Sequence, residues 1–193
     1  MNARIRALLQ ARESSDRDAS YRALVELFAA ADEPVDWAYE VWDRMVADLS
    51  HADGHRRAFA AQMLARLARS DPKKRMLGDF PALAAVLRDD KTVTARHTLQ
   101  SIWRVGRAGS EQKELVLDEL ARRFAECAGE KNGRLVRTDA ITSLGRLFRE
   151  TGDAAVAARA EALMASEADV KAQKKQRACW KKASTAGPAG GCA

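Results

Sequence analysis

The sequence has few of the residues that interrupt helices and few that cross-link a chain. Its 193 residues include 11 glycines and 4 prolines, and aromatic residues make up 6%. The three cysteines, Cys127, Cys179 and Cys192, form no close pair. This excludes a disulfide framework, and we expect a reduced, cytoplasmic location. Alanine and leucine are abundant and 31% of the residues are charged, a composition typical of an all-α soluble protein.

Long apolar runs and catalytic motifs are also absent from the sequence. Because no stretch of about 18 apolar residues occurs, we expect no membrane span. The N-terminal segment MNARIRALLQARESSD has no apolar core of a secretory signal, and its acidic residues argue against an organellar presequence. Glycine-rich phosphate loops and nucleophile elbows are missing. These absences favour a non-enzymatic protein, and we expect no catalytic residue, no metal and no cofactor.

The positive charge of the chain is concentrated near its C-terminus. The formal net charge is +6, and the six basic residues between Lys171 and Lys182 equal this excess, since no acidic residue follows Asp169. Residues 1–170 therefore carry equal numbers of acidic and basic residues. The high isoelectric point by itself does not make the body a nucleic-acid binder.

Three stretches share one amphipathic pattern and define an internal repeat. In the central stretch Leu99, Ile102 and Val105 fall on one arc of a helix. Leu64 and Leu144 take the place of Ile102 in the other two, at spacings of 38 and 42 residues. The stretches are His55–Arg69, Thr94–Arg107 and Arg134–Arg149. A helical period near 40 residues indicates a stacked array of helix pairs.

The same analysis predicts where the helices lie. Helix caps, prolines and turn residues place them at residues 2–12, 20–32, 37–50, 55–69, 79–88, 92–107, 111–128, 134–150 and 153–167. We expect a single domain over residues 1–168. We expect residues 169–193 to form a basic tail, with a loosely held helix over 171–182 and disorder over 184–193.

The period and the pattern of the second helices resemble the HEAT-repeat family over residues 36–168. The motif residues are Val136, Arg137, Ala140, Ile141, Leu144 and Gly145, echoed by Arg57, Ala60, Ala61, Leu64 and Ala65 and by Ala95, Thr98, Leu99, Ile102 and Trp103. The resemblance implies an α-α superhelix of four to five antiparallel helix pairs, which we expect to be right-handed. In that family an early arginine of the second helix pairs with an aspartate of the preceding turn. This implies the pairs Asp53–Arg57 and Asp90–Arg96.

Six arginines recur at matching positions on the three second helices, and we name them the arginine ladder. They are Arg66, Arg69, Arg104, Arg107, Arg146 and Arg149. On a helical wheel the first arginine of each pair lies about 200° from the buried centre, and the second lies about 140° from it. Residues 55–69 and 91–109 contain no acidic residue, and 134–149 contains only Asp139. We therefore expect an exposed basic face that binds an acidic protein surface or a phosphate backbone, because the arginine fork matches both.

A simpler interpretation of the ladder stays open. Cations near a helix C-terminus are stabilised by the helix dipole by about 0.3–1 kcal/mol each, without any ligand. This interpretation does not account for the near absence of acidic residues on the rest of these helices. The two alternatives differ in what a charge reversal changes, which is stability for helix capping and binding for a ligand site.

The sequence supports two classes of function. The first is a scaffold that binds an acidic protein partner along the groove of the solenoid. The second, suggested by architecture, is a DNA-binding protein similar to the HEAT-like DNA alkylation-repair glycosylases, in which Trp103 would be the aromatic residue and Asp139 the acidic residue of the cleft. The HEAT-like phycobiliprotein lyases are a weaker third alternative. The groove residues expected beside the ladder are Trp103, Asp139, His97 and Gln100.

One short turn has the composition of a metal site. His51, Asp53 and His55 bring two imidazoles and a carboxylate within five residues. The spacing matches no strong zinc signature. We therefore expect an Asp-Gly turn with exposed histidines and no metal.

Overall fold

The computed structural model describes residues 1–185 of the chain. Within this part there are ten α-helices, four short 3-10 segments and no strand, so the prediction of an all-α fold is confirmed. The α-helices are α1 (Ala3–Arg12), α2 (Arg17–Ala31), α3 (Ala38–Asp48), α4 (Gly54–Leu67), α5 (Arg75–Ala85), α6 (Thr92–Leu99), α7 (Ser110–Glu126), α8 (Gly133–Thr151), α9 (Ala154–Ala165) and α10 (Val170–Thr185). The 3-10 segments are η1 (Ala68–Ser70), η2 (Val86–Arg88), η3 (Ile102–Arg107) and η4 (Cys127–Gly129).

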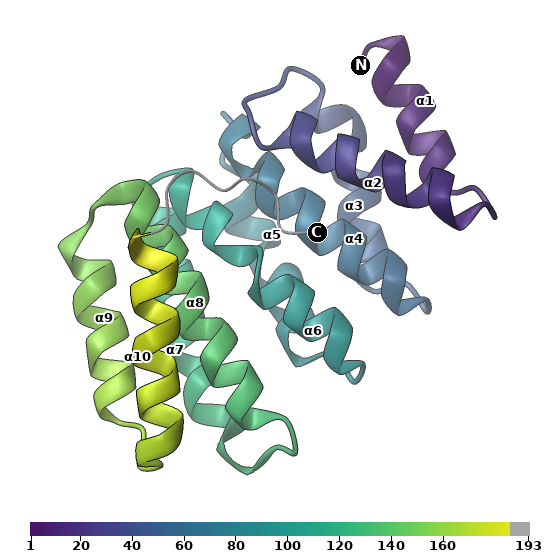
Figure 1. Cartoon of the computed structure of the whole chain (residues 1–193). Coiled ribbons are helices and arrows are strands. Elements are labelled where there is room, and N and C mark those ends of the chain that lie inside the picture. Colours follow the sequence, from purple (N-terminus) through teal and green to yellow (C-terminus); the bar gives the residue numbers. More distant parts are fainter. Residues whose placement is uncertain (186–193) are drawn as a thin grey trace.

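The helices pack as two layers of alternating elements. In one layer α3 contacts α5, α5 contacts α7, and α7 contacts α9. In the other layer, which we call the second layer, α2 contacts α4, α4 contacts α6, α6 contacts α8, and α8 contacts α10. Figure 1 shows the succession of pairs, from α1 and α2 at one end to α9 and α10 at the other. Short loops join each helix to the next, which places sequence neighbours side by side. The right-handed superhelix stays a prediction.

The repeated apolar positions form the centre of the second layer. Leu64 lies in α4, Ile102 begins η3 and Leu144 lies in α8, and all three are fully buried in one continuous core. Their predicted burial is confirmed. The spacing of the apolar residues predicts these helices because each helix buries one face, and that burial supplies most of its stability.

The predicted helix over residues 92–107 is wrong as a single element, because α6 ends before η3 begins. The Ser101 hydroxyl donates to the carbonyl of Thr98 at 3.0 Å, a local bond that competes with regular helix geometry. The Gln100 carbonyl accepts from the Trp103 indole N–H at 3.1 Å. These side chains satisfy carbonyls near the break, and the chain continues as a tighter 3-10 turn.

The C-terminal helix α10 is part of the packed body, which corrects the predicted loosely held helix. It contacts α8 and α9. The Trp180 ring packs on Phe148 with centroids 5.5 Å apart, and Gln176 is fully buried. The disorder predicted for 184–193 lies, from residue 186 on, outside the described residues, whereas residues 184 and 185 belong to α10.

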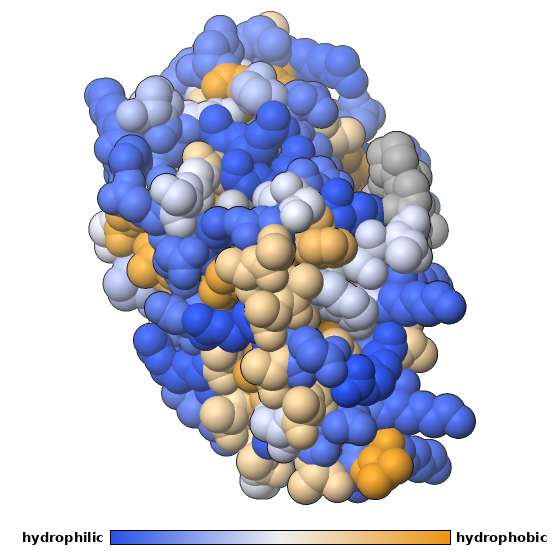
Figure 2. All heavy atoms as spheres, turned by 90° about the vertical axis from the view of Figure 1, so that its left-hand side faces the viewer, coloured by the Kyte–Doolittle hydropathy of each residue, from blue (hydrophilic) through white to orange (hydrophobic). Residues whose placement is uncertain are grey.

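The outer face of α9 closes the array at its C-terminal end. Figure 2 shows this end of the molecule, where weakly hydrophobic side chains form a stripe between hydrophilic ones. The exposed alanines of α9 are Ala154, Ala155, Ala158, Ala162 and Ala165. Within the described residues no helix has the length and apolarity that a membrane crossing requires.

Candidate functional site

The arginine ladder comes from three neighbouring segments of the second layer. Arg66 lies in the last turn of α4 and Arg69 in η1, Arg104 and Arg107 lie in η3, and Arg146 and Arg149 lie in α8. Because η3 contacts α4, η1 and α8, the six side chains gather on one side of this layer. The spacing of three residues within each pair keeps both arginines of a segment on the same side.

The ladder is half-buried, and the expectation of an exposed face is wrong. The side chains of Arg66, Arg104 and Arg107 are 9%, 16% and 22% exposed, and the other three are also partly covered. Neighbouring helices of the layer cover the flanks of these side chains. Guanidinium groups held in this way are shielded from water, so their interactions with anions are stronger than at an open surface.

Asp32, the C-cap residue of α2, lies between the first arginines of the ladder. Arg104 Nε donates to its Oδ1 at 2.7 Å, and Arg104 Nη2 lies 3.4 Å from Oδ2. Arg66 Nε lies 3.3 Å from the same Oδ1, and Arg69 donates to the Asp32 main-chain carbonyl at 3.4 Å. Arg104 therefore reaches from η3 to α2. The sequence analysis did not identify Asp32, since no local pattern links residues 72 positions apart.

The carboxylate of Glu150 contacts two arginines at the other end of the ladder. Arg107 Nη2 lies 3.4 Å from Glu150, and Arg149 Nη2 lies 3.3 Å from it. Arg146 donates to the carbonyl of Gln100 at 2.9 Å. Among the described residues, Asp32 and Glu150 thus contact Arg66, Arg104, Arg107 and Arg149.

Aromatic rings lie beneath three of the arginines. The Arg66 guanidinium stacks 3.8 Å from the centre of the Phe28 ring. Arg104 and Arg107 lie 4.5 Å and 5.5 Å from the centre of the Trp103 ring. Such contacts orient the planar groups and leave their N–H edges as the polar surface of the site.

The pKa of Arg66 shows the electrostatic character of the site. Burial, followed by the nearby charges of Arg104 and Arg146, lowers the pKa of Arg66 to about 9, although Asp32 acts in the opposite direction. The Nε atom of Arg66 is buried and has no hydrogen-bond partner. Burial also lowers the pKa of Arg107. Burial is thus the main cause of both shifts, and for Arg66 the neighbouring guanidinium groups of the ladder add to it.

The groove residues expected beside the ladder are mostly engaged elsewhere. Trp103 is buried and fills space between helices instead of projecting into a groove. Asp139 is buried and accepts from Arg96 Nε at 2.6 Å and from Gln100 Nε2 at 3.2 Å. His97 is exposed, and partial burial together with Arg96 lowers its pKa. An open cleft with a free aromatic ring and a free carboxylate is not formed by these residues.

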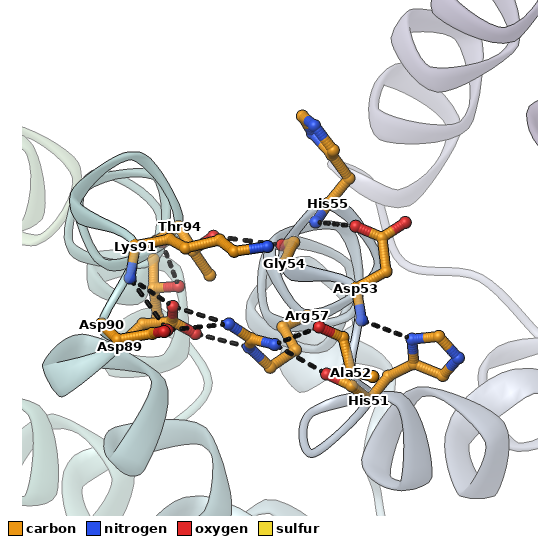
Figure 3. Close-up of polar contacts among 11 residues, drawn as sticks. His51, Ala52, Asp53, Gly54, His55, Arg57, Asp89, Asp90, Lys91 and Thr94 are labelled. Carbon is orange, nitrogen blue, oxygen red and sulfur yellow. Dashed lines mark hydrogen bonds and ion pairs between the residues drawn. The ribbon is translucent and has the colours of Figure 1, made fainter.

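Arg57 shows how the second helices are tied to one another, as seen in Figure 3. Its Nε and Nη2 atoms donate to the two oxygens of Asp89 at 2.5 Å and 2.8 Å, and Nη2 also reaches Asp90 at 3.2 Å. The implied pair Asp53–Arg57 is therefore wrong. Asp53 instead accepts from the main-chain N–H of His55 at 2.9 Å and caps α4.

The other early arginines also bind acidic residues of the following pair. Arg96 binds Asp139, so the implied pair with Asp90 is wrong, and Arg137 donates to Glu167 at 3.0 Å. These ion pairs link successive helix pairs. The resemblance had instead implied that each arginine pairs with an aspartate in the turn before its own helix.

The turn with two histidines does not assemble a metal site. His51 Nδ1 accepts from the main-chain N–H of Asp53 at 2.9 Å, and the His55 ring points away from both, as Figure 3 shows. Among the described residues no cluster of three or more His, Cys, Asp or Glu side chains has an arrangement that could hold a metal ion.

The chemistry available at the ladder is anion binding. Planar guanidinium groups donate two parallel N–H bonds to a carboxylate or a phosphate, and Asp32 already receives such bonds. Helix capping contributes as well, since Arg66 Nη1 donates to the carbonyl of Gln62 at 3.0 Å. A scan of the sequence against models of protein families finds no match, and a search of curated proteins finds none.

Proposed function

We propose that the protein is a non-enzymatic scaffold that binds an acidic protein partner through the arginine ladder. The observation that carries the proposal is the gathering of six half-buried arginines on one side of the second layer, with the pKa of Arg66 lowered by burial and by neighbouring cations. A partner that brings carboxylates to these groups relieves the repulsion among them. The stacked helix pairs are also consistent with a HEAT-like α-solenoid. The cytoplasmic location is likewise a proposal, which rests on the cysteine content of the sequence.

The degree of burial favours side-chain carboxylates over a duplex backbone. Arg66 and Arg104 expose less than a fifth of their side chains, so a ligand must reach them with a narrow group. An aspartate or glutamate side chain meets that requirement, whereas nucleic-acid backbones are usually contacted by cations that extend from the surface. Burial of Trp103 and the contacts of Asp139 remove the residues on which the DNA-binding alternative depended.

Binding of a fluorescein-labelled octaglutamate peptide, followed by fluorescence anisotropy, tests the proposal. We expect saturable binding that weakens as salt rises from about 50 to about 200 mM, because charges are screened over about 8–10 Å at the higher concentration. Changing both Arg107→Gln and Arg149→Gln should weaken binding by about tenfold or more, since each loses a hydrogen bond to a charged group. The matched control is Arg4→Gln with Arg122→Gln, which removes the same charge from exposed positions away from the ladder.

The possible results separate the interpretations. Equal loss of binding in the ladder variant and the control would mean that net charge alone attracts the peptide. Lowered melting temperature of the ladder variant with unchanged binding would mean that the arginines only cap helices. Tighter binding of a duplex DNA of similar charge than of octaglutamate would overturn the choice of an acidic protein partner.

A further inference from the structure

Asp32 occupies an unusual position for an acidic residue. It is the C-cap of α2, where the carbonyl end of the helix dipole disfavours negative charge. Its side chain is 40% exposed, although it is bound by two guanidinium groups that are themselves mostly buried. Asp32 is therefore a solvent-accessible carboxylate that is bound to two mostly buried arginines of the ladder.

We propose that Arg66 and Arg104 form a subsite for one side-chain carboxylate of the partner, and that Asp32 occupies this subsite until the partner displaces it. The inference rests on the proposed function, because it concerns the same arginines. The group that the partner would supply is one carboxylate. Asp32 is the group of this chain that occupies the same position when the partner is absent.

The contacts of Asp32 explain why it can be exchanged. The Arg104 fork holds both of its oxygens, at 2.7 Å and 3.4 Å. Arg66 Nε lies 3.3 Å from Oδ1 without forming a hydrogen bond, so one buried donor stays unsatisfied while Asp32 is bound. A carboxylate from a separate chain is not constrained by the α2 backbone and can satisfy both donors.

The backbone of Asp32 is held independently of its side chain. Arg69 donates to the Asp32 carbonyl at 3.4 Å, and the Asp32 N–H donates to the carbonyl of Phe28 at 3.0 Å. Rotation of the Asp32 side chain into solvent therefore leaves the end of α2 in place. The exchange substitutes one carboxylate for another at the same guanidinium groups and requires no change of fold.

The variant Asp32→Asn tests the exchange, because it keeps the size of the side chain and removes the competing charge. We expect it to bind octaglutamate about tenfold more tightly than the unchanged protein, which corresponds to about 1.4 kcal/mol. The matched control is Glu26→Gln, which removes one negative charge from the same helix at an exposed position. It should change affinity by no more than about twofold, as expected for a distant, screened charge.

A second measurement uses the unchanged protein and does not depend on the folding of a variant. The carboxyl carbon of Asp32 is followed by NMR during titration with octaglutamate. Displacement predicts a change in its chemical shift that saturates together with the anisotropy signal. Binding without any change at Asp32 would overturn the exchange.

The outcomes distinguish the inference from the proposed function. If the unchanged protein binds octaglutamate and Asp32→Asn binds it equally or more weakly, the ladder is a binding site and the subsite assignment is wrong. If neither protein binds octaglutamate, the proposed function fails and the inference fails with it.

Discussion

Gly145 provides a direct test of how α10 is held. A methyl group built at Gly145 in α8 would lie 2.8 Å from Cβ of Ala183, and 3.4 Å from the main-chain nitrogen of Ser184 and from the carbonyl oxygen of Trp180. These neighbours belong to α10 and include its backbone, so no flexible side chain can move aside. Gly145→Ala therefore requires α10 to shift away from α8.

The expected magnitude follows from two opposing effects. Alanine is favoured over glycine within a helix by about 1 kcal/mol. Overpacking of a close contact costs about 1–3 kcal/mol. We expect Gly145→Ala to lower the free energy of unfolding by about 1 kcal/mol. Gly78→Ala is the matched control, because a methyl group at Gly78 in α5 meets nothing within 4 Å. It should raise the free energy of unfolding by about 0.5–1 kcal/mol.

Urea unfolding monitored by circular dichroism measures both changes. In a background of Ala183→Gly, which removes the nearest atom, Gly145→Ala should no longer destabilise the protein, and the double-mutant cycle should give a coupling of about 1 kcal/mol. If Gly145→Ala stabilises the protein as much as Gly78→Ala does, α10 does not pack against α8 in this way, and the reasoning fails.

Three further predictions concern the core, the junction before α10 and the ladder. Leu144→Ala should lower the free energy of unfolding by about 2–5 kcal/mol in urea, because it leaves a cavity in a fully buried position. Burial raises the pKa of Glu167, but hydrogen bonds from the following backbone, Gln176 and Arg137 outweigh it and lower the pKa below its ordinary value of 4.5. The stabilisation of the folded state by ionised Glu167 should be complete above pH 4.5 and lost as pH falls through the lowered pKa. The melting temperature of Glu167→Gln should therefore depend less on pH in that acidic range than the melting temperature of the unchanged protein. Arg66→Met should keep or raise the melting temperature and weaken octaglutamate binding, because a buried cation is replaced by an apolar chain of similar length.

The helices and their buried faces could be predicted because both depend on local patterns. Leu64, Ile102 and Leu144 recur at helical spacing, and all three are fully buried. The interruption between α6 and η3 could not be predicted in the same way. It depends on the Ser101 hydroxyl and on how the Gln100 carbonyl is satisfied, and these contacts exist only once the neighbouring side chains are in place.

The environment of the arginine ladder was predicted less well than its membership. A helical wheel describes one helix alone, and on it Arg66 and Arg104 lie away from the core. In the structure the adjacent second-layer segments cover their flanks, and Asp32 approaches from α2. The same limitation explains the ion-pair partner of Arg57, which lies in the following helix pair and not in the preceding turn.

The burial of Arg66 has an energetic cost that bears on the proposed role of the ladder. Removing a guanidinium group from water is unfavourable, and Arg104 and Arg146 add repulsion, as the lowered pKa of Arg66 indicates. Helix capping needs no such burial, because a cation at an exposed helix end receives the same benefit from the dipole. An apolar residue at this position would pack against Phe28 without that cost. An arginine at this position is therefore consistent with the carboxylate-binding site proposed for the ladder, and Arg66→Met separates the two roles by its opposite effects on melting and on binding.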